Sequence, residues 1–263
     1  MDLARRQPSP GALPEPFRDR AGRPGHGFRY DGRAAALNDP DAGEGAGSRS
    51  AAGRRSGDAS NAANDLDRDT LARRLADFDR RAHELEGRRA AAVAVTVVED
   101  RPGPGILVTR RAAKLRAHPG QWALPGGRFD EGEDAAQAAL RELREELGLA
   151  LGPHVVLGLL DDYSTRSGYR ITPVVVWAGP VADALQPNPD EVASVHVAHA
   201  GDYDVDPMFA SIPESPDPII RLPMLGAWIH APTAAVVYQF RELALHGRTT
   251  RVAHFEQPVF AWR

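Results

Sequence analysis

The pattern of apolar and polar residues divides the chain into a polar first part and a regularly patterned remainder. Up to about residue 62 no helical or strand period persists, and the stretch is crowded with Arg, Gly, Ala, Pro, Ser and Asp. Such a segment buries too little apolar surface to offset the entropy lost on ordering. Residues 1–62 are therefore predicted to be a disordered tail. A nucleic-acid-binding arm is the alternative, but its arginines are interleaved with acidic residues.

From residue 63 to residue 88 the pattern becomes helical. Leu71, Leu75, Phe78 and Leu85 fall near the spacing of one helix face, with charged residues between them. This spacing predicts an amphipathic helix that packs against the rest of the protein. No second helix of a helix-turn-helix precedes it, which argues against a transcription regulator.

Residues 89–263 combine strand and helix periods. Strands are predicted at 90–98, 106–110, 155–160, 171–177, 192–197 and 252–255, and helices at 134–147 and 232–246. A turn through 101–105, rich in Pro and Gly, joins the first two strands into a hairpin. Strands arranged around one central and one late helix predict an α/β sandwich with a mixed β-sheet.

The amino-acid composition excludes several kinds of site and partner. The chain has no cysteine, which excludes disulfides, thiolate metal sites and cysteine nucleophiles. A net charge of −4 is too small to favour nucleic acid or a membrane surface as the main partner. No apolar run reaches the roughly 18 residues of a membrane span, and no secretory signal is apparent. We therefore expect a cytoplasmic monomer or homodimer that acts on a small molecule.

The predicted helix at 134–147 carries the clearest chemistry. Its apolar stripe consists of Ala136, Leu140, Leu143 and Leu147. Glu142, Glu145 and Glu146 are spaced i, i+3 and i+4, so that their carboxylates project together from another side. Clustered carboxylates bind hard ions such as Mg²⁺ or Mn²⁺, although a solvated acidic face is the alternative. Gly126 and Gly127 precede the helix and allow a backbone carbonyl to turn toward such an ion.

Residues 127–149 resemble the Nudix box, G-x5-E-x7-R-E-U-x-E-E-x-G-U, in which U is aliphatic. Every fixed position is matched, by Gly127, Glu133, Arg141, Glu142, Leu143, Glu145, Glu146, Gly148 and Leu149. The resemblance implies an α/β/α sandwich that hydrolyses a nucleoside diphosphate linked to another moiety. It implies that Glu142, Glu145, Glu146 and the Gly127 carbonyl bind Mg²⁺ or Mn²⁺, and that Glu133 and Arg141 pair to orient the loop.

Hydrolysis of a pyrophosphate requires neutralised phosphate charge and an activated water molecule. A divalent ion supplies both, and a carboxylate can accept the proton of the water. Of the three catalytic glutamates that the resemblance implies, Glu145 is the leading candidate for this base, with Glu142 and Glu146 beside it.

Residues 107–127 lie directly before the box and are rich in cations, which suit either a solvated loop or a phosphate-binding rim. They are similar to the second motif of the coenzyme A pyrophosphatase subgroup, L-L-T-x-R-[SA]-x3-R-x3-G-x3-F-P-G-G. The matching residues are Leu107, Thr109, Arg111, Ala112, Arg116, Gly120, Pro125, Gly126 and Gly127, while Val108 and Leu124 depart from the motif. This similarity implies release of 4′-phosphopantetheine and 3′,5′-ADP from coenzyme A. Arg111 and Arg116 would contact phosphates, with the 3′-phosphate as one candidate.

Three functions are consistent with these patterns. The first is a coenzyme A pyrophosphatase. The second is a Nudix hydrolase of ADP-ribose, NADH or a nucleoside triphosphate, and the third is a non-catalytic Nudix-fold binding or regulatory module. The intact set of glutamates argues against the third. Trp122, Tyr163 and Tyr169 are expected in the core rather than stacked on adenine, and residues 188–191 are expected to form a turn, although acidic residues there assist catalysis in some Nudix enzymes.

Overall fold

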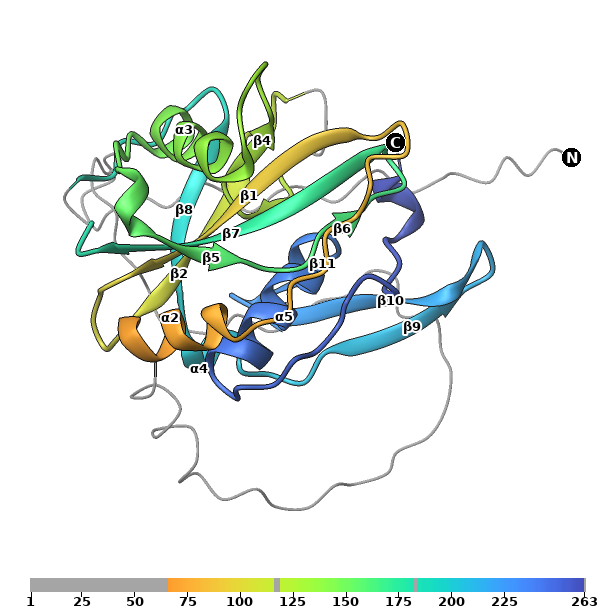
Figure 1. Ribbon diagram of the computed structural model, residues 1–263. Helices are drawn as coiled ribbons and strands as arrows, with labels where there is room; N and C mark the ends of the chain where they lie inside the picture. The colour runs from red at the N-terminus through yellow and green to blue at the C-terminus, as the bar shows by residue number, and fades with distance from the viewer. Residues whose placement is uncertain (1–65, 116–118, 182–183, 263) are drawn as a thin grey trace, which may run out of the picture. The chain divides into compact units, whose positions relative to one another are not determined.

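The computed structural model describes residues 66–115, 119–181 and 184–262 (Figure 1). The predicted tail at 1–62 and the candidate phosphate-binding residue Arg116 therefore lie outside the described residues. Within the described ranges no helix combines the length and the apolar character needed to cross a bilayer.

An eight-stranded mixed sheet forms the centre of the domain (Figure 1). Its strands are β1 (Arg89–Val98), β2 (Gly105–Arg111), β3 (Trp122–Ala123), β4 (Gly126–Arg128), β5 (Val156–Leu159), β6 (Tyr163–Ser164), β7 (Tyr169–Gly179) and β8 (Val192–His199). The order along the sheet is β3-β2-β1-β7-β5, while β4 pairs with β1, β6 with β7 and β8 with β2. β1 and β7 are parallel and the other pairs are antiparallel, so the predicted hairpin and the mixed sheet are both present.

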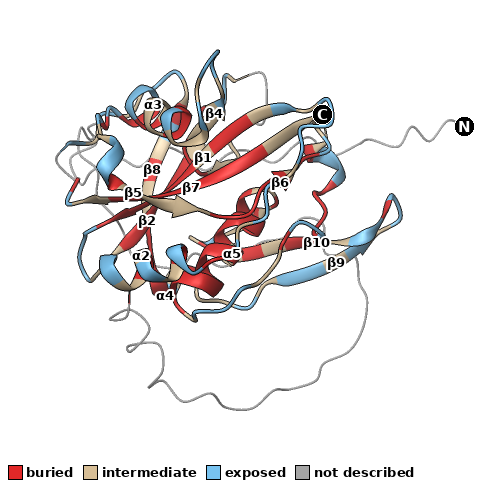
Figure 2. Ribbon diagram, viewed as in Figure 1, coloured by how far each residue is buried: buried red, intermediate tan, exposed pale blue. Residues whose placement is uncertain are grey.

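The two faces of the sheet pack against different helices. Ala92 and Ala94 of β1 join the core cluster that contains Leu143 of helix α3 (Ala135–Leu147). Val95 and Val97 alternate with them and join the cluster that contains side chains of α5 (Thr233–Ala244). Successive residues of a strand point to opposite faces, so one apolar strand contributes side chains to both cores. Figure 2 shows the buried middle of β1 and β7 and the almost fully buried α5. The predicted α/β/α sandwich is thereby confirmed.

A second, three-stranded sheet follows the first and is absent from the sequence-based prediction. It consists of β9 (Met208–Ile212), β10 (Ser215–Met224) and β11 (Ala227–His230), in the order β11-β10-β9, after the short helix α4 (Ala200–Tyr203). Three prolines in β10, at positions 216, 218 and 223, hide the strand because proline is disfavoured inside sheets. The strand predicted at 252–255 is wrong. This segment is not in a strand, and its apolar residues Val252 and Phe255 are buried in the core next to α5.

The amphipathic helix predicted at 63–88 is shorter than expected. Helix α2 spans Arg68–Ala76, and Leu85 is 40% exposed. The helix ends because tertiary contacts take over the backbone of the following residues. The Arg81 amide donates to Asp161 Oδ1 at 2.7 Å, and the His83 amide donates to Asp162 Oδ2 at 2.9 Å. Hydrogen bonds between distant segments thus override a local helical pattern.

Two short 3-10 turns complete the described elements, at Pro153–Val155 and Val259–Ala261. Of the aromatic residues expected in the core, Tyr163 is 1% exposed and donates its hydroxyl to the Phe255 carbonyl at 2.7 Å. Trp122 and Tyr169 are half-buried at the rim of the main sheet. The expectation therefore holds fully for Tyr163 alone.

Candidate functional site

Helix α3 is held at both ends by its own sequence. The Asp134 carboxylate accepts from the Gln137 amide at 2.8 Å, and the Gln137 side chain accepts from the Asp134 amide at 2.9 Å. This reciprocal capping box satisfies two amides that would otherwise lack partners. Gly148 ends the helix in the left-handed region at φ 72°. The helix predicted at 134–147 is therefore present with its predicted stop.

The buried face of α3 differs from the predicted stripe. Leu143 and Leu147 are fully buried as expected, but Ala136 and Leu140 are only half-buried. The other buried positions are Ala138, Ala139 and Glu146. The helix is thus rotated so that one of its three glutamates faces the protein interior. The carboxylates do not project together into solvent, because the Glu146 residue is 5% exposed while the Glu145 side chain is 48% exposed.

Arg141 connects the loop before α3 to the acidic face of the helix. Its Nε donates to Glu133 Oε1 at 2.9 Å, and its Nη2 donates to the Arg128 carbonyl at 2.8 Å. The hydrogen bond from Arg141 is the main cause of the lowered pKa of Glu133. Arg141 Nη1 also donates to Glu142 Oε1 at 2.8 Å and to Glu145 Oε2 at 2.9 Å. The Glu133–Arg141 pair is present, and Arg141 additionally contacts two of the predicted metal ligands.

Negative charge accumulates around Glu146. The pKa of Glu146 is raised to about 8, first by burial and then by the neighbouring charges of Glu142 and Glu191, against the opposing charge of Arg111. The pKa of Glu142 is also raised, first by burial and then by Glu145 and Glu191, despite the hydrogen bond from Arg141. Desolvation and like charges both disfavour an ionised carboxylate, so this part of the site favours a positive partner.

Glu191 belongs to this cluster, but the sequence pattern assigns it only to a turn. It lies in the predicted turn directly before β8, and the Asn188 amide of the same turn donates to the Glu146 carbonyl at 2.8 Å. This backbone bond holds the turn against the end of α3. The sequence signal for this residue is the acidic pair Asp190-Glu191 directly before a predicted strand. Only the fold brings the charge of Glu191 close to Glu142 and Glu146.

The donor set fits a hard divalent cation. As the side chains stand, no three Asp, Glu or His residues in the described ranges are grouped closely enough to bind an ion. A Cβ atom on Gly127 would overlap the Glu142 carboxylate, which shows how closely that carboxylate approaches the backbone of β4. A cation bound by Glu142, Glu146 and the Gly127 carbonyl would offset both the burial and the like charges that raise the two pKa values. Carboxylate and carbonyl oxygens suit Mg²⁺ or Mn²⁺.

Arg111 is the only one of the two predicted phosphate-binding arginines that the described residues include. It is the last residue of β2, half-buried, and its charge lowers the pKa of Glu146. Its buried Nε atom has no hydrogen-bond partner among the described residues. A buried donor without a partner is costly, so a ligand oxygen at this position would be stabilising. Arg111 thus offers a positive, unsatisfied group next to the acidic cluster.

We expect Gly127→Ala to weaken Mn²⁺ binding by about tenfold or more, the range seen when groups that orient metal ligands are removed. The added Cβ overlaps the Glu142 carboxylate and displaces it. Titration of Mn²⁺ by electron paramagnetic resonance measures this change. Gly201→Ala is the matched control because a Cβ at Gly201 meets nothing within 4 Å. Equal Mn²⁺ affinity in the two variants would contradict the assignment of Glu142 to the ion.

The fold and the site together define a class of protein. A mixed sheet lies between helices, and one of these helices gathers glutamates and an arginine beside a Gly-Gly strand. This is the α/β/α architecture with an acidic helix that the resemblance implied. Residues 87–214 match the model of the NUDIX domain, and this part of the chain belongs to the Nudix family.

Curated relatives agree with this assignment. The chain is 44% identical over 94 residues to the "Uncharacterized Nudix hydrolase NudL" of Salmonella newport (strain SL254), and equally to that of Salmonella agona (strain SL483). The aligned part is 35% of this chain and 48% of each relative. The chain therefore spans about half the length of the curated relatives it matches.

Solved structures of Nudix proteins are similar at lower identity. The Nudix hydrolase RenU from M. smegmatis is 21% identical with a TM-score of 0.41, covering 63% of this chain and 91% of that chain. The MutT protein from Methanosarcina mazei Go1 is 18% identical with a TM-score of 0.36, covering 49% of this chain and 86% of that chain. Similarity at this level carries no information about the substrate.

Proposed function

We propose that this protein is a divalent-metal-dependent hydrolase that cleaves the diphosphate bond of coenzyme A or its derivatives to 4′-phosphopantetheine and 3′,5′-ADP. The observation that carries the proposal is the position of Arg111. This arginine belongs to the stretch that is similar to the coenzyme A subgroup motif, and it ends β2 where its charge acts on Glu146. The substrate motif and the acidic cluster thus meet at one place in the fold.

Each residue has a proposed role. Glu142, Glu145, Glu146 and the Gly127 carbonyl bind Mg²⁺ or Mn²⁺, which when bound neutralises phosphate charge and lowers the pKa of a water molecule. Glu145 has the most accessible of the three carboxylates, with 48% of its side chain exposed, and accepts the proton of the attacking water.

The two arginines bind the substrate. Arg111 donates its unsatisfied Nε–H to a phosphate oxygen, and Arg116 is assigned a phosphate contact from the motif alone. Hydrolysis of ADP-ribose, NADH or a nucleoside triphosphate is the alternative within the same chemistry, because the α3 carboxylates would serve any diphosphate. The retained glutamates disfavour a non-catalytic module.

The proposal is tested by incubating the full-length protein with Mg²⁺ or Mn²⁺ and, separately, coenzyme A, ADP-ribose, NADH and dATP. We expect coenzyme A to release 3′,5′-ADP and 4′-phosphopantetheine, identified by mass. The kcat/KM for each of the other compounds is expected to be at least about tenfold lower, because one strong polar contact contributes a factor of this size. A Glu146→Gln variant purified in parallel excludes a contaminating enzyme. Faster turnover of another compound would discard coenzyme A as the substrate, and binding without any turnover would favour the non-catalytic module.

A further inference from the structure

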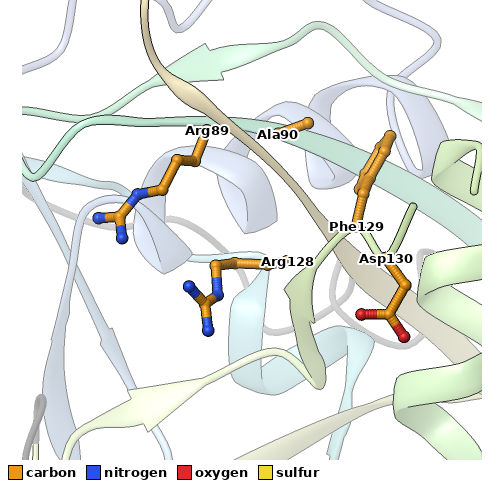
Figure 3. Close-up of a pocket in the computed structure, with 5 residues that line it drawn as sticks. All are labelled: Arg89, Ala90, Arg128, Phe129 and Asp130. Atoms are coloured by element: carbon orange, nitrogen blue, oxygen red, sulfur yellow. The ribbon is translucent and has the colours of Figure 1, made fainter. Parts of the chain in front are cut away.

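A pocket of about 340 Å³ lies where β1 begins and β4 ends, and two arginines line it (Figure 3). Its lining residues are Arg89, Ala90, Arg128, Phe129 and Asp130. The two strands are joined here, since Ala91 pairs with Arg128 and the Phe129 amide donates to the Ala90 carbonyl at 3.1 Å. The pocket is therefore framed by hydrogen-bonded backbone and adjoins the loop that enters α3.

Both arginine side chains lie on the face of the sheet opposite α3. Gly127 approaches Glu142 of α3, and Phe129 packs with the apolar cluster of α3, so Arg128 between them points to the other face. Arg89 lies an even number of residues from Val95, whose side chain belongs to the cluster on that other face. Figure 3 shows the two guanidinium groups extended in the same direction, away from Phe129 and from the Asp130 carboxylate.

The guanidinium groups of Arg89 and Arg128 are not paired with carboxylates of the described residues. In the described part of the chain, neither Arg89 nor Arg128 forms an ion pair, and Asp130 is directed to Arg141 Nε at 3.4 Å. The Arg89 guanidinium lies over the Tyr169 ring, 4.2 Å from its centroid, which orients it. The Arg128 carbonyl is held by Arg141 at 2.8 Å. Both residues are exposed, and only the Arg89 guanidinium is oriented by a side-chain contact. Two neighbouring guanidinium groups without acidic partners among the described residues suit a dianion such as a phosphate monoester better than a single carboxylate.

We propose that Arg89 and Arg128 form a subsite for a phosphate monoester that the substrate carries outside the diphosphate to be cleaved. Arg128 follows Gly127 directly, so the backbone of the subsite is one residue, roughly 3.3 Å along the strand, from that of the proposed ion ligand. It lies on the other face, and the bound group is therefore not the diphosphate itself. This proposal rests on the proposed function, under which the group is the 3′-phosphate of coenzyme A, retained in 3′,5′-ADP. Arg111 is then left for the diphosphate beside Glu146.

Binding of product-like probes tests the subsite without turnover. Calorimetric titration of the full-length protein with 3′,5′-ADP, 2′,5′-ADP and AMP, in one Mg²⁺ buffer, compares ligands that differ only in the monoester. We expect 3′,5′-ADP to bind at least about tenfold more tightly than AMP, as expected for charge-assisted hydrogen bonds, and Arg89→Gln/Arg128→Gln to remove the difference. Tighter binding of 2′,5′-ADP that the double variant also removes would support the subsite and assign it to a 2′-phosphate. Arg68→Gln, at an exposed position in α2, is the matched control.

Two results would overturn the subsite. One is equal affinity of the wild-type protein for AMP and both bisphosphates, and the other is a preference that survives in the double variant. Thermal unfolding of each variant shows that it is folded, and Arg89→Lys/Arg128→Lys, which keeps both charges, is expected to retain part of the preference. If wild-type protein binds 3′,5′-ADP through these arginines but does not hydrolyse coenzyme A, the proposed function fails and the subsite stands. If the wild-type protein hydrolyses coenzyme A but binds 3′,5′-ADP no more tightly than AMP, the subsite fails and the proposed function stands.

Discussion

Glu146→Gln is expected to reduce coenzyme A hydrolysis by about a hundredfold to a thousandfold while the protein stays folded. An ion that stabilises transition-state charge contributes several kcal/mol, and each 1.36 kcal/mol corresponds to about a tenfold change in rate. Glutamine fills nearly the same volume but lacks the negative charge that the ion requires. Steady-state kinetics at saturating Mg²⁺ measure the loss. Glu131→Gln, in the exposed loop before α3, is the control and is expected to retain wild-type activity.

The same substitution separates a catalytic loss from a folding defect. Glu146 is buried, and its pKa is raised to about 8 by burial and by the charges of Glu142 and Glu191. A neutral amide at this position carries no desolvated charge. In metal-free buffer the thermal midpoint of the variant is therefore expected to equal or exceed that of the wild type. A folded variant with full activity would contradict the assignment of Glu146 as a ligand of the ion.

Asp162→Ala is expected to lower the free energy of unfolding by about 3–5 kcal/mol, the range for breaking a buried ion pair by removing one partner. Asp162 is fully buried. Its carboxylate accepts hydrogen bonds from Arg80 Nη2 at 2.6 Å, from Thr172 Oγ1 at 2.7 Å and from the His83 amide at 2.9 Å. Without Asp162, donors on two segments, the stretch after α2 and strand β7, lose their shared acceptor. Urea denaturation followed by circular dichroism measures the loss.

A second aspartate in the same region provides the comparison. Within the described ranges Asp79 forms one ion pair, with Arg251 at 3.6 Å, and its side chain is 91% exposed. Exposed ion pairs contribute little to stability, so Asp79→Ala is expected to leave the urea midpoint nearly unchanged. Equal midpoints for the two variants would show that the Asp162 network does not hold the segment after α2 on the sheet.

Much of the fold and one part of the site follow from local sequence. Capping residues, a glycine stop and one apolar period define α3, and these act within a few residues of one another. The hairpin of β1 and β2 is likewise encoded by two apolar runs around a Pro-Gly turn. The Glu133–Arg141 pair could also be predicted, because the family motif fixes both positions on the loop and the helix.

Features of the fold that depend on contacts between distant segments were set by the tertiary structure. The helix at 63–88 was predicted too long because Asp161 and Asp162, some 80 residues away, bind its C-terminal backbone. The sheet β9–β11 was missed because its prolines obscure the strand period, whereas the pairing of neighbouring strands stabilises it.

The candidate site likewise has features set by local sequence and features set by the fold. The sequence determined the acidic helix, its caps and the glycines before it, since each depends on neighbours in the chain. Only the fold turned Glu146 inward, brought the charge of Glu191 to it, and placed Arg89 beside Arg128. The physical reason is that strand register and helix rotation are set by burial of the whole core, and a linear pattern does not specify which residues from separate elements then become neighbours.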